Sequence, residues 1–266
     1  MDKVGALLLA SWRAARSYRL RLAMSVGALA ISVLPMWYAA SALQGLMADK
    51  IRGEGSQYPP FLIVGMIVYG LLMVMVNALP NALSGGIANG SLEALLATKI
   101  KTPELLLGMF SYDLCWALLR ALVILVTAAL LGARFAWDHA LAAIPVLVLI
   151  LLAYVPFGLM AAASVLAFRT AGPFPQIVLI LSGLLGGAYF PTKVIPDMVQ
   201  YVSKVVPLTY GLRSLRAVLL DGQSLVSVSR DITILIGMTL LLFATAILVL
   251  DVTLRHVRRG GGLSQY

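Results

Sequence analysis

Long apolar stretches, separated by short polar segments, run from one end of the sequence to the other. Each stretch is about 20 residues long, which is the length that an α-helix needs to cross the hydrocarbon core of a bilayer. The pattern therefore predicts an all-α membrane protein that forms a single domain over residues 1–266. Its six transmembrane helices are expected at Leu22–Ala42, Pro60–Leu83, Leu105–Leu131, Ala140–Phe168, Phe174–Phe190 and Ile232–Leu254.

The composition agrees with a membrane protein and excludes an ordinary soluble one. Hydrophobic residues make up 61% of the chain and charged residues 12%, against about half and about a quarter in soluble domains. The net charge of +9 raises the question of a nucleic-acid partner. The basic residues lie between the apolar stretches and form no continuous stripe, so we expect no nucleic acid and assign them to orientation in the membrane.

The basic residues also predict which way the chain faces. With an even number of spans, the N-terminal segment, the segment after the second span, Arg169 and the C-terminus share one side of the membrane. The positive-inside rule places that side in the cytoplasm, so both termini are expected there. Residues 191–230 then lie outside, although they also contain basic residues such as Lys193 and Arg230.

Residues 1–21 are expected to form an amphipathic helix that lies on the inner surface of the membrane. At helical spacing, Arg13 and Arg16 face one side and the opposite side carries the apolar residues Val4, Leu7, Leu8, Ala15 and Tyr18. A solvated basic leader that only sets the orientation stays open as the alternative.

Residues 84–102, between the second and third spans, contain a second short helix by prediction. It begins after the turn residues Asn89-Gly90 with Ser91 and continues as an amphipathic stretch through Thr98. Thr102-Pro103-Glu104 has the cap, proline and acid that are typical of a new helix start. The short helix is either a simple connector or a docking element for a soluble partner.

Residues 191–230 are divided by prolines into pieces that are too short to span a bilayer. Pro191, Pro196 and Pro207 leave two helical pieces, at about 196–206 and 208–220. We expect two re-entrant helices that bury their apolar faces against the spans, while Arg213 and Arg216 extend to the lipid headgroups.

The order of these features resembles the permease subunits of ABC type-2 exporters, over nearly the whole chain. The resemblance rests on a basic interfacial helix, on Gly90-Ser91-Leu92-Glu93-Ala94-Leu95-Leu96-Ala97-Thr98 after the second span, and on a series of motifs before the last span. That series is Tyr189-Phe190-Pro191, Ile195-Pro196, Pro207-Leu208-Thr209-Tyr210, Leu215-Arg216 and Asp221-Gly222. The chain departs from many relatives where Lys99-Ile100-Lys101 precedes Thr102-Pro103.

The resemblance implies a permease homodimer, or a close heterodimer, in a bacterial-type inner or plasma membrane. It implies two cytoplasmic ATP-binding subunits beneath the dimer. It also implies export of an amphipathic or lipid-linked molecule, such as a drug, a lipid, a glycolipid or a lipid-linked polysaccharide. We assign coupling to the ATPase to Arg13, Arg16, Ser91, Leu92, Glu93, Leu95, Leu96 and Arg169.

The chain itself contains no motif for ATP hydrolysis. No Gly-x-x-x-x-Gly-Lys-Ser/Thr stretch occurs, and Lys101-Thr102 lacks the glycine loop that would cradle phosphates. We therefore expect a permease without enzymatic activity of its own, with ATP and Mg on the partner ATPase. The single cysteine, Cys115, lies inside an apolar stretch, so we expect a small buried residue there and no metal site.

The resemblance implies a transport path between two copies, lined by the first, second and fifth spans. We assign Asn77, Ser182, Gly186, Tyr189 and Phe190 to this path and its outer gate, because bulky aromatic residues follow glycines that allow close helix approach. Alternatively, the two aromatic rings only anchor the fifth span at the outer interface.

Asp113 and Arg120 are the ionisable pair inside the third span. They lie seven residues apart and nearly on one face, so they are expected to pair with each other or across the dimer. A contact with a polar group of the substrate is the functional alternative.

Two other classes of protein stay open. A membrane-embedded lipid-modifying enzyme needs clustered acids or histidines, whereas His139 and His256 lie in opposite polar loops. A secondary transporter needs no ATPase but usually contains inverted repeats, and the first three spans show no clear repeat in the last three. The aliphatic spans, which lack a dense aromatic belt, favour a small amphipathic or lipid-like substrate.

Overall fold

The computed structural model describes residues 19–88, 102–168 and 170–259. Every element of these segments is a helix: α2 (Arg19–Ala42), α3 (Gln44–Met47), α4 (Tyr58–Ala88), α6 (Thr102–Leu130), η1 (Trp137–His139), α7 (Ala140–Phe168), α8 (Phe174–Leu185), η2 (Thr192–Val194), α9 (Asp197–Ser203), α10 (Pro207–Leu219) and α11 (Ser229–Arg259). Most of the predicted interfacial helix and coupling segment, at 1–21 and 84–102, lies outside the described residues.

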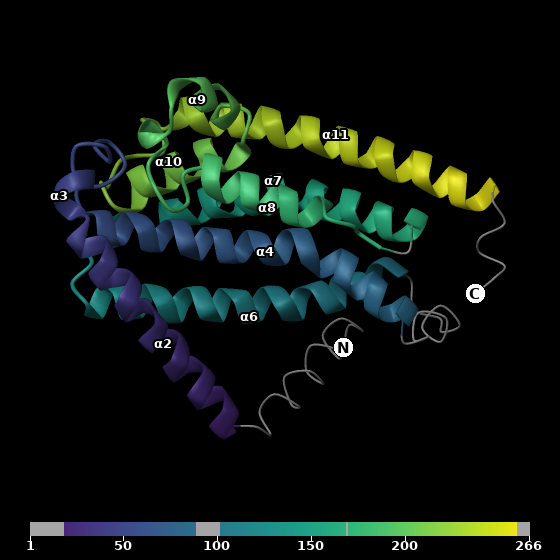
Figure 1. Ribbon diagram of the computed structural model, residues 1–266, viewed down its shortest axis with the longest axis horizontal. Helices are drawn as coiled ribbons and strands as arrows, with labels where there is room; N and C mark the ends of the chain where they lie inside the picture. The colour runs from purple at the N-terminus through teal and green to yellow at the C-terminus, as the bar shows by residue number, and fades with distance from the viewer. Residues whose placement is uncertain (1–18, 89–101, 169, 260–266) are drawn as a thin grey trace.

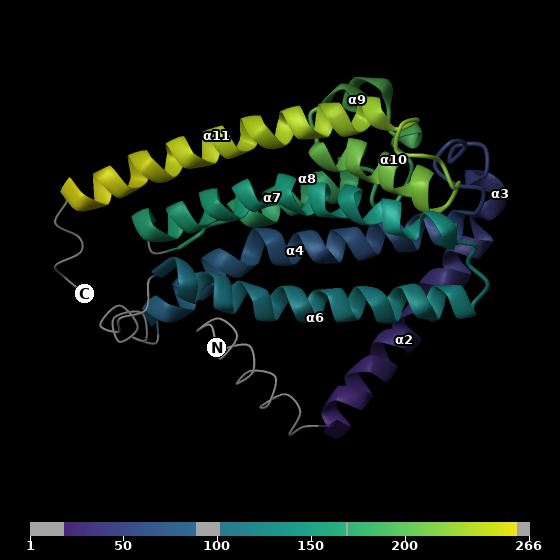
Figure 2. The same ribbon diagram turned by 180° about the vertical axis from the view of Figure 1, so that it is seen from behind.

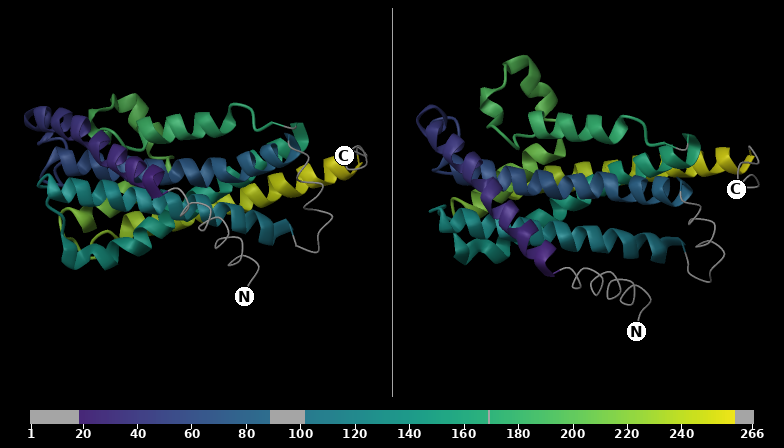
Figure 3. Two further views of the ribbon diagram at one scale, coloured as in Figure 1. Left: turned by 90° about the horizontal axis from the view of Figure 1, so that it is seen from below. Right: turned by 60° about the horizontal axis from the view of Figure 1, so that its bottom comes forward.

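The long helices run side by side, and the short ones gather at one end of the bundle (Figure 1). This end, which carries α3, α9 and α10, is called the α10 end below. The last residues of α4, α7 and α11 lie at the opposite end. Helix α2 crosses the bundle obliquely (Figure 3).

Four helices are long and apolar enough to cross a membrane, within α4, α6, α7 and α11. The chain is therefore a multi-pass membrane protein. Helix α7 has the predicted bounds, and the other three begin and end within a few residues of the prediction. The described apolar part of α2, Val26–Ala42, is shorter, so six full spans stay a prediction.

The predicted fifth span is shorter than expected. Helix α8 ends at Leu185 after 12 residues, a rise of about 18 Å against a hydrocarbon core of about 30 Å. The helix stops because Gly186 ends it and Gly187 then adopts a left-handed conformation with φ of 80°, which turns the chain. Tyr189 and Phe190 consequently lie in a turn and not on the helix.

The two short helices before the last span are confirmed. Pro196 and Pro207 stand at the starts of α9 and α10. These helices are seven and 13 residues long and lie near the predicted bounds. The Ser203 hydroxyl donates to the carbonyl of Leu185 at 2.5 Å, and the Thr209 hydroxyl donates to the carbonyl of Ser203 at 2.7 Å. These two bonds tie the end of α8 to α9 and α10.

Helix α7 is the centre of the bundle, because it packs against α11, α4 and α10. Gly158 allows its close approach to α4, since a Cβ there would overlap the carbonyl oxygen of Met75. Tyr154 is fully buried, and its hydroxyl donates to Ser182 of α8 at 2.7 Å. Helix α6 instead packs against α4 and α2, and Figure 2 shows it running alongside α4.

Candidate functional site

Arg216 of α10 is among the most deeply buried residues of the molecule, although the sequence predicted that it reaches the headgroups. Only 1% of it is exposed. Ten of the 13 residues of α10 are buried, because this short helix lies among α4, α7 and α11 and not on the bundle surface. Its polar side chains must therefore find partners inside the protein. Arg213, three residues earlier, is 43% exposed and agrees better with the prediction.

The guanidinium of Arg216 is bonded to three backbone carbonyls. Its Nε and Nη2 donate to Phe61 at 3.2 and 2.9 Å, its Nη1 donates to Gly187 at 2.9 Å, and its Nη2 donates to Ala188 at 3.3 Å. The Cζ atom also lies 3.4 Å from the centre of the Phe61 ring. One side chain thus joins α10 to the start of α4 and to the turn after α8.

Glu54 provides the counter-charge from the loop before α4. Its Oε2 lies 3.4 Å from Arg216 Nη1, and the residue is only 8% exposed. Burial lowers the pKa of Arg216 to about 10, with the charge of Glu54 acting in the opposite direction, so the guanidinium is charged at neutral pH. Glu54, Phe61, Gly187, Ala188 and Arg216 are called the Arg216 cluster below.

A more exposed ion-pair network borders the cluster. Arg213 Nη1 lies 3.5 Å from Asp231 Oδ2 at the start of α11, and Arg213 Nε lies 4.0 Å from Glu54 Oε1. Glu54 therefore faces both arginines of α10. The contacts connect the loop before α4, α10 and the start of α11 at one end of the bundle.

Glycines make this arrangement possible. A Cβ on Gly65 of α4 would overlap the carbonyl oxygen of Ala188, so only glycine lets the turn approach α4 closely enough to place its carbonyls on Arg216. Gly53 and Gly55 flank Glu54 with φ values of 89° and 146°. These backbone conformations favour glycine and direct the loop inward.

The predicted gate residues Tyr189 and Phe190 lie next to the Arg216 cluster. The ring of Tyr189 packs against the ring of Tyr69 on α4, and the two ring centroids are 5.5 Å apart. The Tyr58 hydroxyl donates to the carbonyl of Tyr189 at 2.9 Å. Both gate residues are half-buried, so the turn is held against α4 of its own chain.

The structure brings the other predicted path residues only partly together. Gly186 lies at the same turn, where a Cβ would stand 2.8 Å from Leu208 Cβ. Ser182, one helical turn earlier, accepts the hydrogen bond of Tyr154 and is buried. Asn77 lies apart from them, further along α4, and its Nδ2 donates to the carbonyl of Met73 within its own helix at 2.9 Å.

Among the ion pairs that the described residues form, none joins Asp113 to Arg120. Both side chains are exposed on α6, and the guanidinium of Arg120 lies 5.7 Å from the ring of Trp116. Cys115, expected to be buried, is also exposed. The reason is that few residues of α6 are buried in the single chain. A contact of Asp113 or Arg120 across a dimer stays a prediction.

The residues assigned to ATPase coupling lie outside the described part of the chain: Arg13, Arg16, Ser91, Leu92, Glu93, Leu95, Leu96 and Arg169. At the end of the bundle opposite the α10 end, Asp251 and Arg255 of α11 form an exposed ion pair at 2.7 Å. Within the described segments, no three side chains of His, Cys, Asp or Glu gather in a way that could hold a metal ion.

Sequence reasoning did not identify Glu54. It lies in a polar loop that also contains Asp49, Lys50 and Arg52, and nothing in the charge pattern distinguishes Glu54 from these exposed charges. The available signal was the flanking pair Gly53 and Gly55, which indicates an unusual backbone around the carboxylate.

A family model described as ABC-2 type transporter matches residues 5–220. The chain is 27% identical to Nodulation protein J of Rhizobium meliloti, over 84% of this chain and 85% of that protein. It is 26% identical to Nodulation protein J of Bradyrhizobium diazoefficiens over 80% of each chain. It is also 22% identical to the linearmycin resistance permease protein LnrN of Bacillus subtilis, over 76% of this chain and 52% of that protein.

Replacing Glu54 should destabilise the protein far more than replacing an exposed acid of the same loop. Glu54→Gln leaves the charge of Arg216 buried without a counter-charge, and we expect a loss of about 3 kcal/mol. Asp49→Asn breaks the exposed pair with Arg52, whose side chains are both 79% exposed, and should cost less than about 1 kcal/mol. Unfolding midpoints in mixed micelles measure both, and equal shifts would contradict the structural role of Glu54.

Proposed function

Because the chain belongs to the ABC-2 type transporter family, we propose that it is the membrane-spanning permease subunit of an ATP-driven exporter. The observation that carries this proposal is the family match, which extends from residue 5 through all the described spans except α11. The chain has no Walker-type sequence, so the energy has to come from a separate ATP-binding subunit. Two such subunits and two permease chains make the expected assembly.

In this proposal the transport path lies between two copies of the chain. Helices α2 and α8 support it because both present apolar side chains that the described residues leave exposed. Ile31 of α2 is 66% exposed, and on α8 Ile177 and Leu181 are 50% and 47% exposed. A second copy would cover part of this surface and leave the remainder to line the path.

The substrate class that we propose is an amphipathic or lipid-linked molecule. One relative is named for resistance to linearmycin and others for nodulation. The apolar surfaces of α2 and α8 would accept the apolar part of such a molecule. A polar ion or free sugar would find few partners there.

We also propose that both termini are cytoplasmic and that the α10 end faces outward, on the basis of the positive-inside rule. In a Cys115→Ala background, a cysteine at the exposed Ser224 should react with a membrane-impermeant maleimide in intact cells. A cysteine at Ser264 should react only after permeabilisation. Reaction at Ser264 in intact cells would invert the proposed topology.

The energy of ATP hydrolysis should enter through the segment around Glu93. We expect Glu93→Lys to weaken the copurification of the ATP-binding subunit about tenfold, or to abolish substrate-stimulated ATPase activity, because it reverses a charge on a docking surface. Asp49→Lys, at an exposed site at the α10 end, is the control and should leave both unchanged.

Two results would contradict this coupling role. Normal assembly and normal stimulated ATPase activity in Glu93→Lys would make the segment a simple connector. The absence of any ATP-binding subunit from a transport-competent wild-type preparation would favour the secondary transporter.

The turn at Tyr189 and Phe190 should close the path at the α10 end. We expect the double substitution Tyr189→Ala and Phe190→Ala to admit a small dye into proteoliposomes and to raise basal ATPase activity, with a loss of a few kcal/mol in stability. Tyr201→Ala, at a position of α9 that is 69% exposed, is the matched control. If the double variant assembles, stays impermeable and couples normally, the two rings only anchor the turn.

A further inference from the structure

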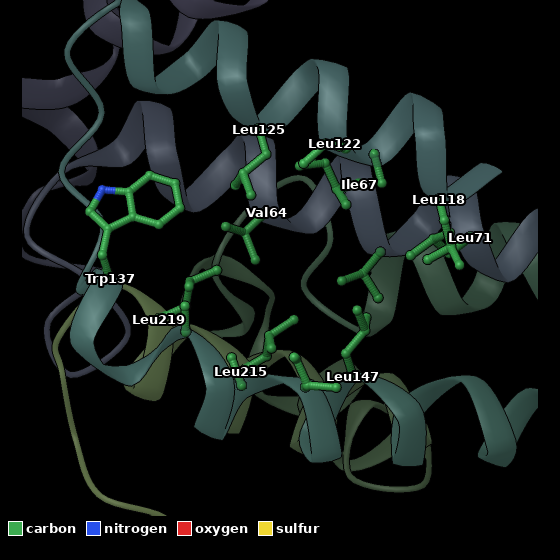
Figure 4. Close-up of a pocket in the computed structure, with 15 residues that line it drawn as sticks. Val64, Ile67, Leu71, Leu118, Leu122, Leu125, Trp137, Leu147, Leu215 and Leu219 are labelled. Carbon is green, nitrogen blue, oxygen red and sulfur yellow. The ribbon is translucent and has the colours of Figure 1, made fainter. Parts of the chain in front are cut away.

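A cavity of about 250 Å³ lies between α6 and α7, and α4 and α10 form its floor. Figure 4 shows the labelled side chains converging on it from these helices. Leu122 of α6 and Leu147 of α7 lie on opposite sides of the cavity, and Val64 of α4 and Leu215 of α10 also line it. This space is called the α6–α7 groove below, and it lies away from the proposed path along α2 and α8.

The lining of the groove is hydrocarbon, apart from one tryptophan. All other side chains that line it belong to Val, Ile, Leu or Ala. Water in a buried site needs two to four polar partners, so it is a poor occupant here. An empty apolar cavity is also unfavourable, because the lining atoms lose their dispersion contacts. The favourable occupant is therefore hydrocarbon.

The groove opens sideways toward the surroundings of the spans. Leu122 and Ile144, which line it from α6 and α7, are 56% and 51% exposed. We expect the acyl chains of the bilayer outside this opening, because α6 and α7 are both long and apolar enough to cross a membrane. A helix of a second protein, which is about 10 Å wide with its side chains, does not fit into a space of about 250 Å³. A single extended acyl chain is narrow enough.

Trp137 gives the groove a polar end. It belongs to η1 at the start of α7, it is 56% exposed, and Figure 4 places it at the opposite end of the groove from Leu71 and Leu118. Tryptophan favours the level of the lipid headgroups, where its ring is apolar and its N–H can bond. The same loop carries Arg134, an exposed cation that suits a lipid phosphate.

We propose that the α6–α7 groove binds one acyl chain of a bilayer phospholipid, with the headgroup at Trp137 and the chain end near Leu71 and Leu118. The proposed lipid site also contacts α10, the helix that carries Arg216. Leu215 and Leu219 line the groove, and Leu215 is the direct neighbour of Arg216 in the sequence. A bound acyl chain therefore supports the helix that carries the Arg216 cluster, and phospholipid should stabilise the α10 end.

Two substitutions that fill the groove from different helices test the proposal on the full-length protein. Ala121→Phe on α6 and Ala140→Phe on α7 each place a ring in the space that the acyl chain would occupy. Ala244→Phe, at an exposed position of α11 away from the groove, is the matched control. Folding of each variant is checked by gel filtration, and either filling variant is sufficient if the other does not fold.

The probe is phosphatidylglycerol, added to protein that has been delipidated in detergent. Native mass spectrometry should show one retained phospholipid for each wild-type and Ala244→Phe chain, and about tenfold less in the filling variants. Added phosphatidylglycerol should raise the unfolding temperature of the wild type and the control but not that of the filling variants.

Three results would overturn the proposal. These are equal phospholipid retention in the filling variants, an equal loss in Ala244→Phe, and a retained species whose mass is not that of a phospholipid. The last result would assign the groove to the transported molecule or to another ligand. None of these measurements depends on ATP or on transport, so the proposed function and the lipid site can fail separately.

Discussion

The buried positive charge of Arg216 is the constraint on which the α10 end of the molecule depends. A guanidinium removed from water is strongly unfavourable unless acceptors and a counter-charge surround it. Three backbone carbonyls and Glu54 meet this requirement, and they come from the loop before α4, from the first turn of α4 and from the turn after α8. Each of these segments is therefore held in one position relative to α10.

Several features of the chain that look unrelated follow from that requirement. The turn after α8 must present its carbonyls toward α10, so α8 ends early at Gly186 and Gly187 is left-handed. The turn must also lie close to α4, which requires the missing side chain of Gly65. Its position in turn brings Tyr189 against Tyr69. The proposed gate is thus part of the same packed unit as the buried charge.

Helix α10 also connects the proposed gate to the proposed lipid site. One part of its surface carries Arg216, and Leu215 and Leu219 contribute to the α6–α7 groove. The proposed coupling segment lies between α4 and α6 in the chain, and α4 and α7 run from the α10 end to the opposite end. These two helices are in close contact at Gly158.

The sequence alone determined the features that depend on neighbouring residues. Apolar stretches of sufficient length located α4, α6, α7 and α11, and prolines located α9 and α10, because span length and helix starts are local properties. The order of motifs led to the correct family. Only the tertiary structure decided where α8 ends, that Arg216 points inward, and that Glu54 is its partner. The two partners are 162 residues apart, whereas a hydropathy pattern averages over about 20 residues. Such a pattern therefore cannot show whether a distant segment supplies the acceptors that make a buried charge stable.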